Sequence, residues 1–252
     1  MIISGQGELH LTVIIERLKR KFRVEVNELE PKIPYRETIT AVGDSKYRHK
    51  KQTGGAGQFA EVWMRVEPVE RGSGVEFASE VVGMAIDRVF IPSIEKGVRA
   101  ASDDGVISGH KVTDVRAVVY DGKQHPVDSK DIAFQIAGRE AFKEGFKNAK
   151  PILLEPIHDV EVTVPEAYTG DVVGDLNSRR GKILGMESQG PFQVVKAKVP
   201  LAEMYKYSTT LRSLTQGTGG HSMQFSHYEV VPRDVQEKII AQAKAEKEKD
   251  KD

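Results

Sequence analysis

The chain has 252 residues, which leaves room for one large domain or two ordinary ones. Its 37 Lys and Arg residues balance 37 Asp and Glu residues, so any nucleic-acid binding must come from local patches. Cysteine is absent, which excludes disulfides, zinc–thiolate sites and a cysteine nucleophile. The apolar runs are too short for a membrane span or a signal peptide, so we expect a soluble cytoplasmic protein without a membrane partner.

Residues 1–33 predict an incomplete strand–helix–strand unit. Short strands are indicated near 1–4 and 23–26, and an apolar stripe at helical spacing lies between them, made of Leu11, Ile14, Ile15, Leu18 and Phe22. The breakers Pro31 and Pro34 end the unit. Two strands and one helix seldom form a stable sheet alone, so either this unit packs on the rest of the chain or its other half is missing.

Residues 34–153 predict a mixed α+β domain. Strand-like runs lie at 59–66, 75–82 and 112–120. One helix is predicted over about 92–102, and a second begins after Asp128 and Ser129 and stops before Pro151.

Residues 154–231 predict the order β-α-β-β-α-β of a ferredoxin-like sandwich, so the whole chain is α+β and multidomain. The strands are expected at 158–164, 182–187, 193–199 and 222–230, with helices over about 166–179 and 201–211. Residues 232–252 carry many charges and few large apolar side chains, so we expect a solvated, frayed tail.

The glycine-rich loop at 52–58 has two interpretations. It lacks the Lys-Ser/Thr pair that a nucleotide-binding P-loop needs, so it is either a plain hairpin end or a loop that contacts RNA. Basic residues just before it, with no acid among them, favour phosphate contacts. The candidate RNA-binding residues here are Lys50, Lys51, Gly54, Gly55, Gly57 and Gln58, with Lys46 and Arg48 in the same basic arm.

A second loop at 121–128 is predicted to expose Gln124 and His125 near its end. Asp121 and Asp128 raise the question of a metal site, but no second imidazole or thiolate joins them. We prefer a hydrogen-bonding contact with RNA or protein, although a merely solvated histidine fits the sequence as well.

Arg179 and Arg180 stand at the end of the predicted helix over 166–179. They suit either the negative end of the helix dipole or a phosphate group, and sequence alone leaves both open. No motif of a hydrolase, metalloprotease or dinucleotide-binding enzyme is present. The residues therefore indicate a binding or scaffolding protein without catalytic residues.

Several segments together resemble the C-terminal part of bacterial elongation factor G. In order along the chain they are SGQGELHL at 4–11, YRETI at 35–39, QTGGAGQF at 52–59, LEPI at 154–157, GDVVGDLNSRRG at 170–181 and PLAEM at 200–204. The resemblance implies that 1–33 correspond to the second half of the third domain of the family. Residues 34–153 then correspond to the elongated fourth domain, related to a small-subunit ribosomal protein fold, and 154–231 to the fifth.

The resemblance also implies a role in translation. The fourth domain of the family enters the decoding site of the ribosome and contacts the tRNA–mRNA duplex through a tip, which here contains Gly54, Gly55, Gly57, Gln58 and His125. The fifth domain lies against ribosomal RNA and the stalk base, which favours RNA contacts by Arg179 and Arg180. The GTPase domain, with its GTP and magnesium, would lie outside this chain, which we expect to be a monomer without cofactor or enzymatic activity.

Departures from the family pattern leave other functions open. Ala56 and Pro126 in the tip, and Lys206 in place of a usual glycine, suit an elongation-factor-G-like paralogue that acts in ribosome recycling. A stand-alone RNA-binding module and a nucleotide-using enzyme built around 54–57 are the hypotheses from other classes.

Overall fold

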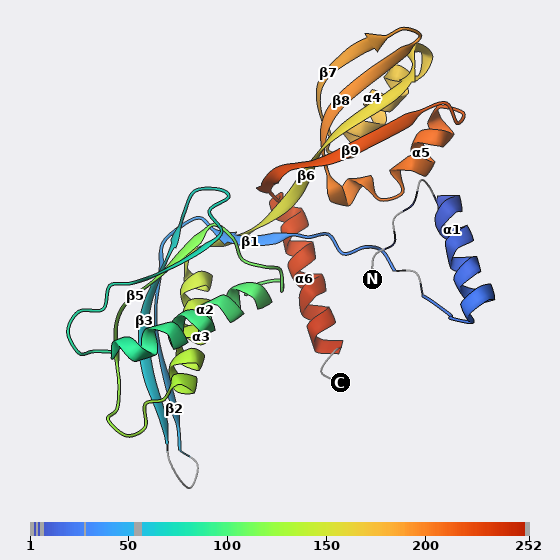
Figure 1. Ribbon diagram of the computed structural model, residues 1–252. Helices are drawn as coiled ribbons and strands as arrows, with labels where there is room; N and C mark the ends of the chain where they lie inside the picture. Colours follow the sequence, from blue (N-terminus) through green and yellow to red (C-terminus); the bar gives the residue numbers. More distant parts are fainter. Residues whose placement is uncertain (1–2, 4, 6–7, 28, 53–56, 250–252) are drawn as a thin grey trace. The chain divides into compact units, whose positions relative to one another are not determined.

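The computed structural model describes residues 3, 5, 8–27, 29–52 and 57–249, which form two compact units. Unit 1 comprises Met1–Pro34 and Glu155–Glu229, and unit 2 comprises Tyr35–Leu154 and Val230–Asp252 (Figure 1). Strand β6 (Pro151–Pro165) belongs to both, because its first four residues pair with β1 (Arg36–Ile39) of unit 2 and the remainder with unit 1. Within the described residues, no helix is long and apolar enough to cross a membrane.

Unit 1 contains the predicted ferredoxin-like order. After β6 come η3 (Glu166–Tyr168), α4 (Thr169–Ser178), β7 (Lys182–Gln189), β8 (Phe192–Pro200), η4 (Leu201–Met204), α5 (Tyr207–Leu214) and β9 (Gly220–Val230). The strands lie in the order β7-β8-β6-β9. Alternation in β6 buries Val160, Val162 and Val164 in one core with Val172 and Leu176 of α4, as the sequence pattern indicated.

The N-terminal part of unit 1 differs from its prediction. The helix is present as α1 (Glu8–Arg17) and continues as one π-helical turn, Leu18–Phe22, which ends at Arg23 in the left-handed conformation (φ 53°). The strand predicted at 23–26 is wrong, because these residues pair with no other strand. An isolated strand has nothing to satisfy its backbone N–H and C=O groups, so the alternation at Val24 and Val26 alone does not produce one. The other predicted strand falls mostly on residues outside the described part.

Unit 2 contains a four-stranded sheet in the order β2-β3-β5-β4. Its strands are β2 (Gly43–Lys51), β3 (Gln58–Pro68), β4 (Val75–Ser79) and β5 (Val115–Lys123). β2, β3 and β5 are antiparallel neighbours, whereas β4 runs parallel to β5. The sequence predictions missed β2, because charged residues fill one of its faces and the other has Gly43, Ser45, Tyr47 and His49 instead of aliphatic side chains.

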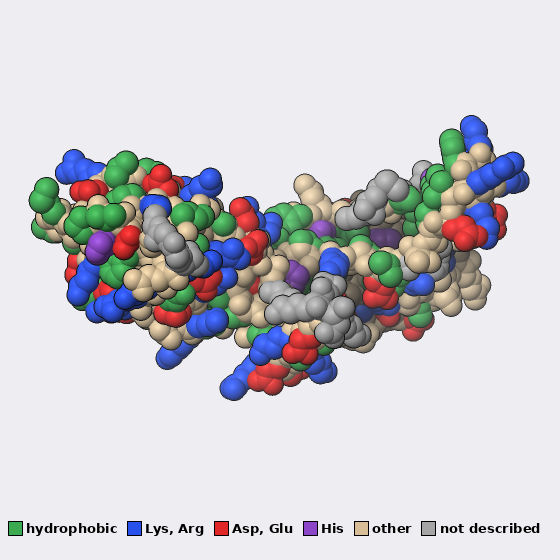
Figure 2. All heavy atoms as spheres, turned by 90° about the horizontal axis from the view of Figure 1, so that it is seen from below, with side chains coloured by type: hydrophobic (Ala, Val, Ile, Leu, Met, Phe, Trp, Pro, Cys, Tyr) green, Lys and Arg blue, Asp and Glu red, His purple; other side chains and the backbone are tan. Residues whose placement is uncertain are grey.

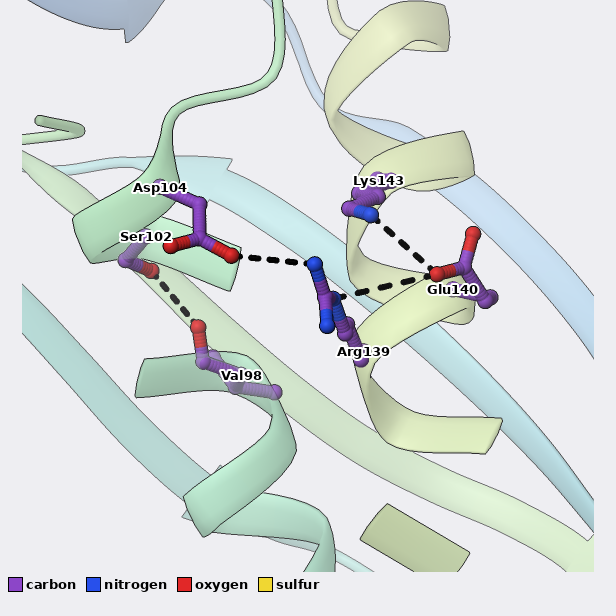
Figure 3. Close-up of polar contacts among 6 residues, drawn as sticks. All are labelled: Val98, Ser102, Asp104, Arg139, Glu140 and Lys143. Carbon is purple, nitrogen blue, oxygen red and sulfur yellow. Dashed lines mark hydrogen bonds and ion pairs between the residues drawn. The ribbon is translucent and has the colours of Figure 1, made fainter. Parts of the chain in front are cut away.

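Two helices, α2 (Ile91–Asp104) and α3 (Asp131–Asn148), cover one face of this sheet, and η2 (Arg88–Phe90) precedes α2. They pack closely because glycines lie between them: a Cβ on Gly97 would come within 2.1 Å of the Gln135 carbonyl oxygen. Polar contacts line the same helix pair (Figure 3). Arg139 of α3 donates a hydrogen bond to Asp104 of α2 at 2.9 Å, while Lys143 donates to Glu140 at 3.1 Å.

The charged C-terminal segment forms a helix, α6 (Arg233–Lys249), where we predicted a solvated tail. Its first turns are anchored to unit 2: the Gln236 side chain accepts a hydrogen bond from the Leu153 backbone N–H at 3.0 Å. Partly buried side chains recur along one side of the helix, at Val235, Ile239 and Ala243. The prediction gave the charges of this segment more weight than its helical spacing of small and apolar residues.

Candidate nucleic-acid interface

The first predicted loop joins β2 and β3, which pair up to Lys51 and Gln58. The Gln58 side-chain oxygen lies 2.9 Å from Nε2 of His49, so a neighbour on β2 holds this amide. Gly57 is buried, and a Cβ there would lie 3.0 Å from the Asp128 carboxyl group, so any larger residue would press on the side chain of the second loop. Residues 53–56, which include Gly54 and Gly55, lie outside the described part.

The second predicted loop folds around His125. Its backbone N–H donates to the Ser129 hydroxyl at 2.8 Å, and its carbonyl accepts from the Ser129 N–H at 3.2 Å. The imidazole Nδ1 accepts two backbone N–H groups, from Val127 at 3.3 Å and Asp128 at 3.2 Å. Two donors aimed at Nδ1 place its lone pair there and the ring proton on Nε2. The Asp128 carboxylate lies 3.6 Å from the same Nδ1, and the side chain is 51% exposed, so the imidazole is open to a further hydrogen-bond partner.

Hydrogen bonds tie the two loops together at Phe59, the second residue of β3. The Phe59 N–H donates to the Asp128 carbonyl at 3.0 Å, and the Ser129 hydroxyl donates to the Phe59 carbonyl at 2.9 Å. The Phe59 and His125 rings lie 6.2 Å apart between centroids. The structure therefore brings Gly57, Gln58 and His125 into one assembly, which we call the tip. Sequence reasoning did not identify Phe59 or Ser129 as parts of it.

The Gln124 side chain lies in a different environment from that of His125. Its side-chain oxygen accepts the Asp87 backbone N–H at 2.8 Å and so connects a third loop, between β4 and α2, to the end of β5. Beneath it, Ile86 packs so tightly that a Cβ on Gly122 would lie 2.5 Å from its side chain. Gln124 therefore holds a loop beside the tip, and RNA binding by this residue stays a prediction.

The predicted basic arm of β2 divides into two pairs. Lys46 and Arg48 form ion pairs with Glu61, which lies across the hairpin and is fully buried. Burial raises the pKa of Glu61, but hydrogen bonds from Trp63 and Arg48 and the nearby positive charges outweigh it, so the net pKa is lowered. No described residue pairs with the ammonium groups of Lys50 and Lys51. Figure 2 shows basic and hydrophobic side chains side by side at this end of unit 2.

Arg179 and Arg180 are held inside unit 1. Arg179 donates to Asp175 at 2.8 Å and to the Glu203 carbonyl at 2.6 Å, and it lies 5.1 Å from the Tyr207 ring centre. Arg180 donates two parallel hydrogen bonds to buried Glu155, at 2.8 and 2.7 Å, and a third to Glu203 at 3.0 Å. The Glu155 hydrogen bonds raise the pKa of Arg180 against the effect of burial, and Glu203 adds to the rise. This is a structural role, and phosphate binding by either guanidinium stays a prediction.

The structure also describes the surroundings of the metal and nucleotide candidates considered above. Within the described residues, no group of His, Asp and Glu side chains has the arrangement of a metal site, and the Asp121 carboxylate accepts the Gly122 N–H. The glycine-rich loop joins two antiparallel strands, whereas a P-loop leads from a strand into a helix whose N-terminus receives the phosphate. The strands on either side of this loop are therefore not arranged as in a P-loop.

Comparisons with known proteins agree on one family. Family models described as elongation factor G domain III, domain IV and C-terminus match residues 1–29, 31–150 and 152–239. The chain is 53% identical over 249 residues to "Elongation factor G" of Aquifex pyrophilus, covering 98% of this chain and 35% of that protein. It is also 53% identical over 246 residues to "Elongation factor G-like protein" of Thermotoga maritima, covering 97% and 36%.

A solved structure is similar to this chain over most of its length. A crystal structure of a protein from Thermus thermophilus matches with a TM-score of 0.84 and 44% identity, over 96% of this chain and 36% of the other. The chain thus spans about a third of the length of the relatives that it matches. It belongs to the elongation factor G family, of which it contains part of domain III, domain IV and the C-terminal domain.

Proposed function

We propose that this chain is the ribosome-binding part of a translocase, in which the tip of unit 2 enters the decoding site and contacts the tRNA–mRNA duplex. There it would occupy the space that the tRNA leaves and prevent the tRNA from slipping back after GTP-driven movement. In this role the chain acts by occupying space, and it makes or breaks no covalent bond. GTP and magnesium would bind to other domains of the full-length protein.

The observation that carries this proposal is the hydrogen-bonded joining of the two tip loops at Phe59 and Ser129. It holds the half-exposed imidazole of His125 in the same assembly as Gln58, close along β2 and β3 to Lys50 and Lys51, which pair with no described residue. Hydrogen-bond donors and flexible cations next to exposed backbone are the groups that contact the RNA backbone. In the same proposal unit 1 rests on large-subunit RNA and the stalk-base protein by the end of α4 that carries Arg179 and Arg180, away from its sheet, and the protein acts as a cytoplasmic monomer.

The test is co-sedimentation of the 252-residue chain with ribosomes at low and moderate salt. We expect salt-sensitive binding, because neutralised phosphates release counterions. The variant His125→Ala loses one hydrogen-bond donor at the tip, and we expect its affinity to fall about tenfold. Its own stability should fall by no more than about 1 kcal/mol, since two backbone N–H groups lose their acceptor but remain near solvent.

The matched control is His227→Ala, which removes another half-exposed histidine, bonded to Glu229 on the sheet of unit 1. Its co-sedimentation should equal that of the unmodified chain. Equal binding by all three proteins would contradict the placement of the tip on RNA. A loss in His227→Ala of the same size as in His125→Ala would show that the measurement does not report on the tip.

A role in ribosome recycling is the second candidate function. It is favoured by Pro126, which follows the tip histidine and stiffens the loop, and by the similarity to a protein named "Elongation factor G-like protein". In the full-length protein the two functions are separated by single-turnover translocation, measured against splitting of post-termination ribosomes. Activity in splitting alone would select recycling.

A further inference from the structure

The sheet of unit 2 has one face that no described helix covers, which we call the open face. Helices α2 and α3 cover only the side that buries Ala60, Val62, Met64 and Val66 of β3. Because side chains alternate along a strand, the residues between them point to the opposite side. Strand β3 therefore presents Phe59, Glu61 and Trp63 on the open face, in sequence from the tip toward the base of the unit.

Strand register groups the open-face residues into rows. The first row pairs Lys50 with Phe59, and the next two are Arg48–Glu61–Lys123 and Lys46–Trp63–Asp121. These three rows carry four cations and two carboxylates. Further from the tip the rows are Asp44–Arg65–Val118 and Glu67–Arg116–Glu76, with two cations and three carboxylates. The half of the face that adjoins the tip is thus positive, and the other half is negative.

Aromatic rings lie within the positive half. The Trp63 indole N–H donates to Glu61 at 2.9 Å, which fixes the orientation of the ring, and Tyr120 meets it edge-on at 6.3 Å between centroids. The Lys46 ammonium lies 3.8 Å from the Trp63 ring centre. Phe59 continues the aromatic surface to the tip, where it contacts His125. Rings interleaved with cations on a sheet are typical of surfaces that bind single-stranded nucleic acid.

We propose that this positive half of the open face, from Phe59 to Trp63, binds a segment of single-stranded RNA. Its phosphates would lie on Lys50 and Lys123, which pair with no described residue, and its bases against the Phe59 and Trp63 rings. Rows about 6.6 Å apart suit an extended strand with one nucleotide to a row. Burial of Glu61 beneath Arg48 keeps its carboxylate from repelling the phosphates. The proposal rests on the RNA-binding function above and extends it from the tip loops to the sheet.

The chain offers a direct probe, because Trp63 is its single tryptophan. Titration of the full chain with a twelve-nucleotide oligouridylate should quench the Trp63 emission in a saturable, salt-sensitive way. In Lys50→Ala/Lys123→Ala, the slope of log affinity against log salt concentration should become less steep by about 1.4. Each of the two lost phosphate contacts accounts for about 0.7 of this change. The matched control is Arg116→Ala, on the same face in its negative half, and its slope should stay unchanged.

Each result decides the proposal. No quenching, or a slope that Arg116→Ala changes as much as the lysine pair does, overturns it. Equal quenching by polyglutamate of the same charge would show a general anion surface and also overturns it. If ribosome binding depends on His125 while RNA leaves the Trp63 emission unchanged, only the sheet proposal fails. If RNA quenches the Trp63 emission while His125→Ala leaves ribosome binding unchanged, only the proposed function fails.

Discussion

The tip of unit 2 and the arginine pair of unit 1 were both predicted to contact RNA. Their basic side chains differ in whether they form ion pairs within their own domain. At the tip, Lys50 and Lys51 pair with no described residue, and backbone N–H groups hold the half-exposed imidazole of His125. In unit 1, Arg179 and Arg180 are bonded to carboxylates and a carbonyl of their own domain. The lysines are therefore more readily available to a ligand, because phosphate binding by the arginines would compete with their carboxylate partners.

The largest effect that this comparison predicts is on folding. Arg180→Ala leaves Glu155, whose side chain is 4% exposed, as an uncompensated buried charge. We expect the free energy of unfolding of unit 1 to fall by about 3 kcal/mol, measured by urea denaturation followed by circular dichroism.

The control for this variant is Arg180→Ala combined with Glu155→Gln. It removes the stranded charge and should recover part of the loss, because a neutral amide costs less to bury than a carboxylate. A loss below about 0.5 kcal/mol in Arg180→Ala would contradict a structural role. It would return this arginine to the candidates for RNA binding.

The two regions also differ in what sequence could predict. The order of elements in unit 1 follows from strong alternation such as that of Val160, Val162 and Val164. The tip depends on contacts between Phe59 and the loop at 125–129, about 70 residues away, and no spacing rule connects them. The basic arm looked free of acids because Glu61 comes later in the chain, and only the hairpin register places it opposite Arg48 and within reach of Lys46.

A change in pH is expected to have a smaller effect, on the stability of unit 1. Burial lowers the pKa of His221, which meets Tyr207 edge-on, and burial also lowers the pKa of His158 against weaker opposing contributions. The unfolded chain therefore binds protons more readily than the folded one. The stability that these groups contribute is present above the unfolded pKa of about 6.5 and is lost as the pH falls through the folded values.

The measurement is the urea midpoint of unit 1 at about pH 7.5 and about pH 5.5, on either side of the unfolded value, and we expect a lower midpoint at the lower pH. His221→Phe keeps a ring against Tyr207 but cannot take up a proton, so the decline should be shallower in this variant. An identical decline in both proteins would show that His221 is not one of the responsible groups.

The smallest effect on stability is expected at the tip, and it completes the comparison. Lys50→Ala/Lys51→Ala removes two exposed ammonium groups that pair with no described residue, so the free energy of unfolding should change by no more than about 0.5 kcal/mol. Ribosome binding should weaken and become less salt-sensitive, whereas Lys196→Ala, which removes a lysine paired with Glu187 on unit 1, should leave binding unchanged. A double variant that lost stability and kept its ribosome affinity would mean that these lysines are structural, as the arginines are. Unchanged stability with weakened ribosome binding would show that the lysines bind a ligand, whereas the arginines stabilise the fold.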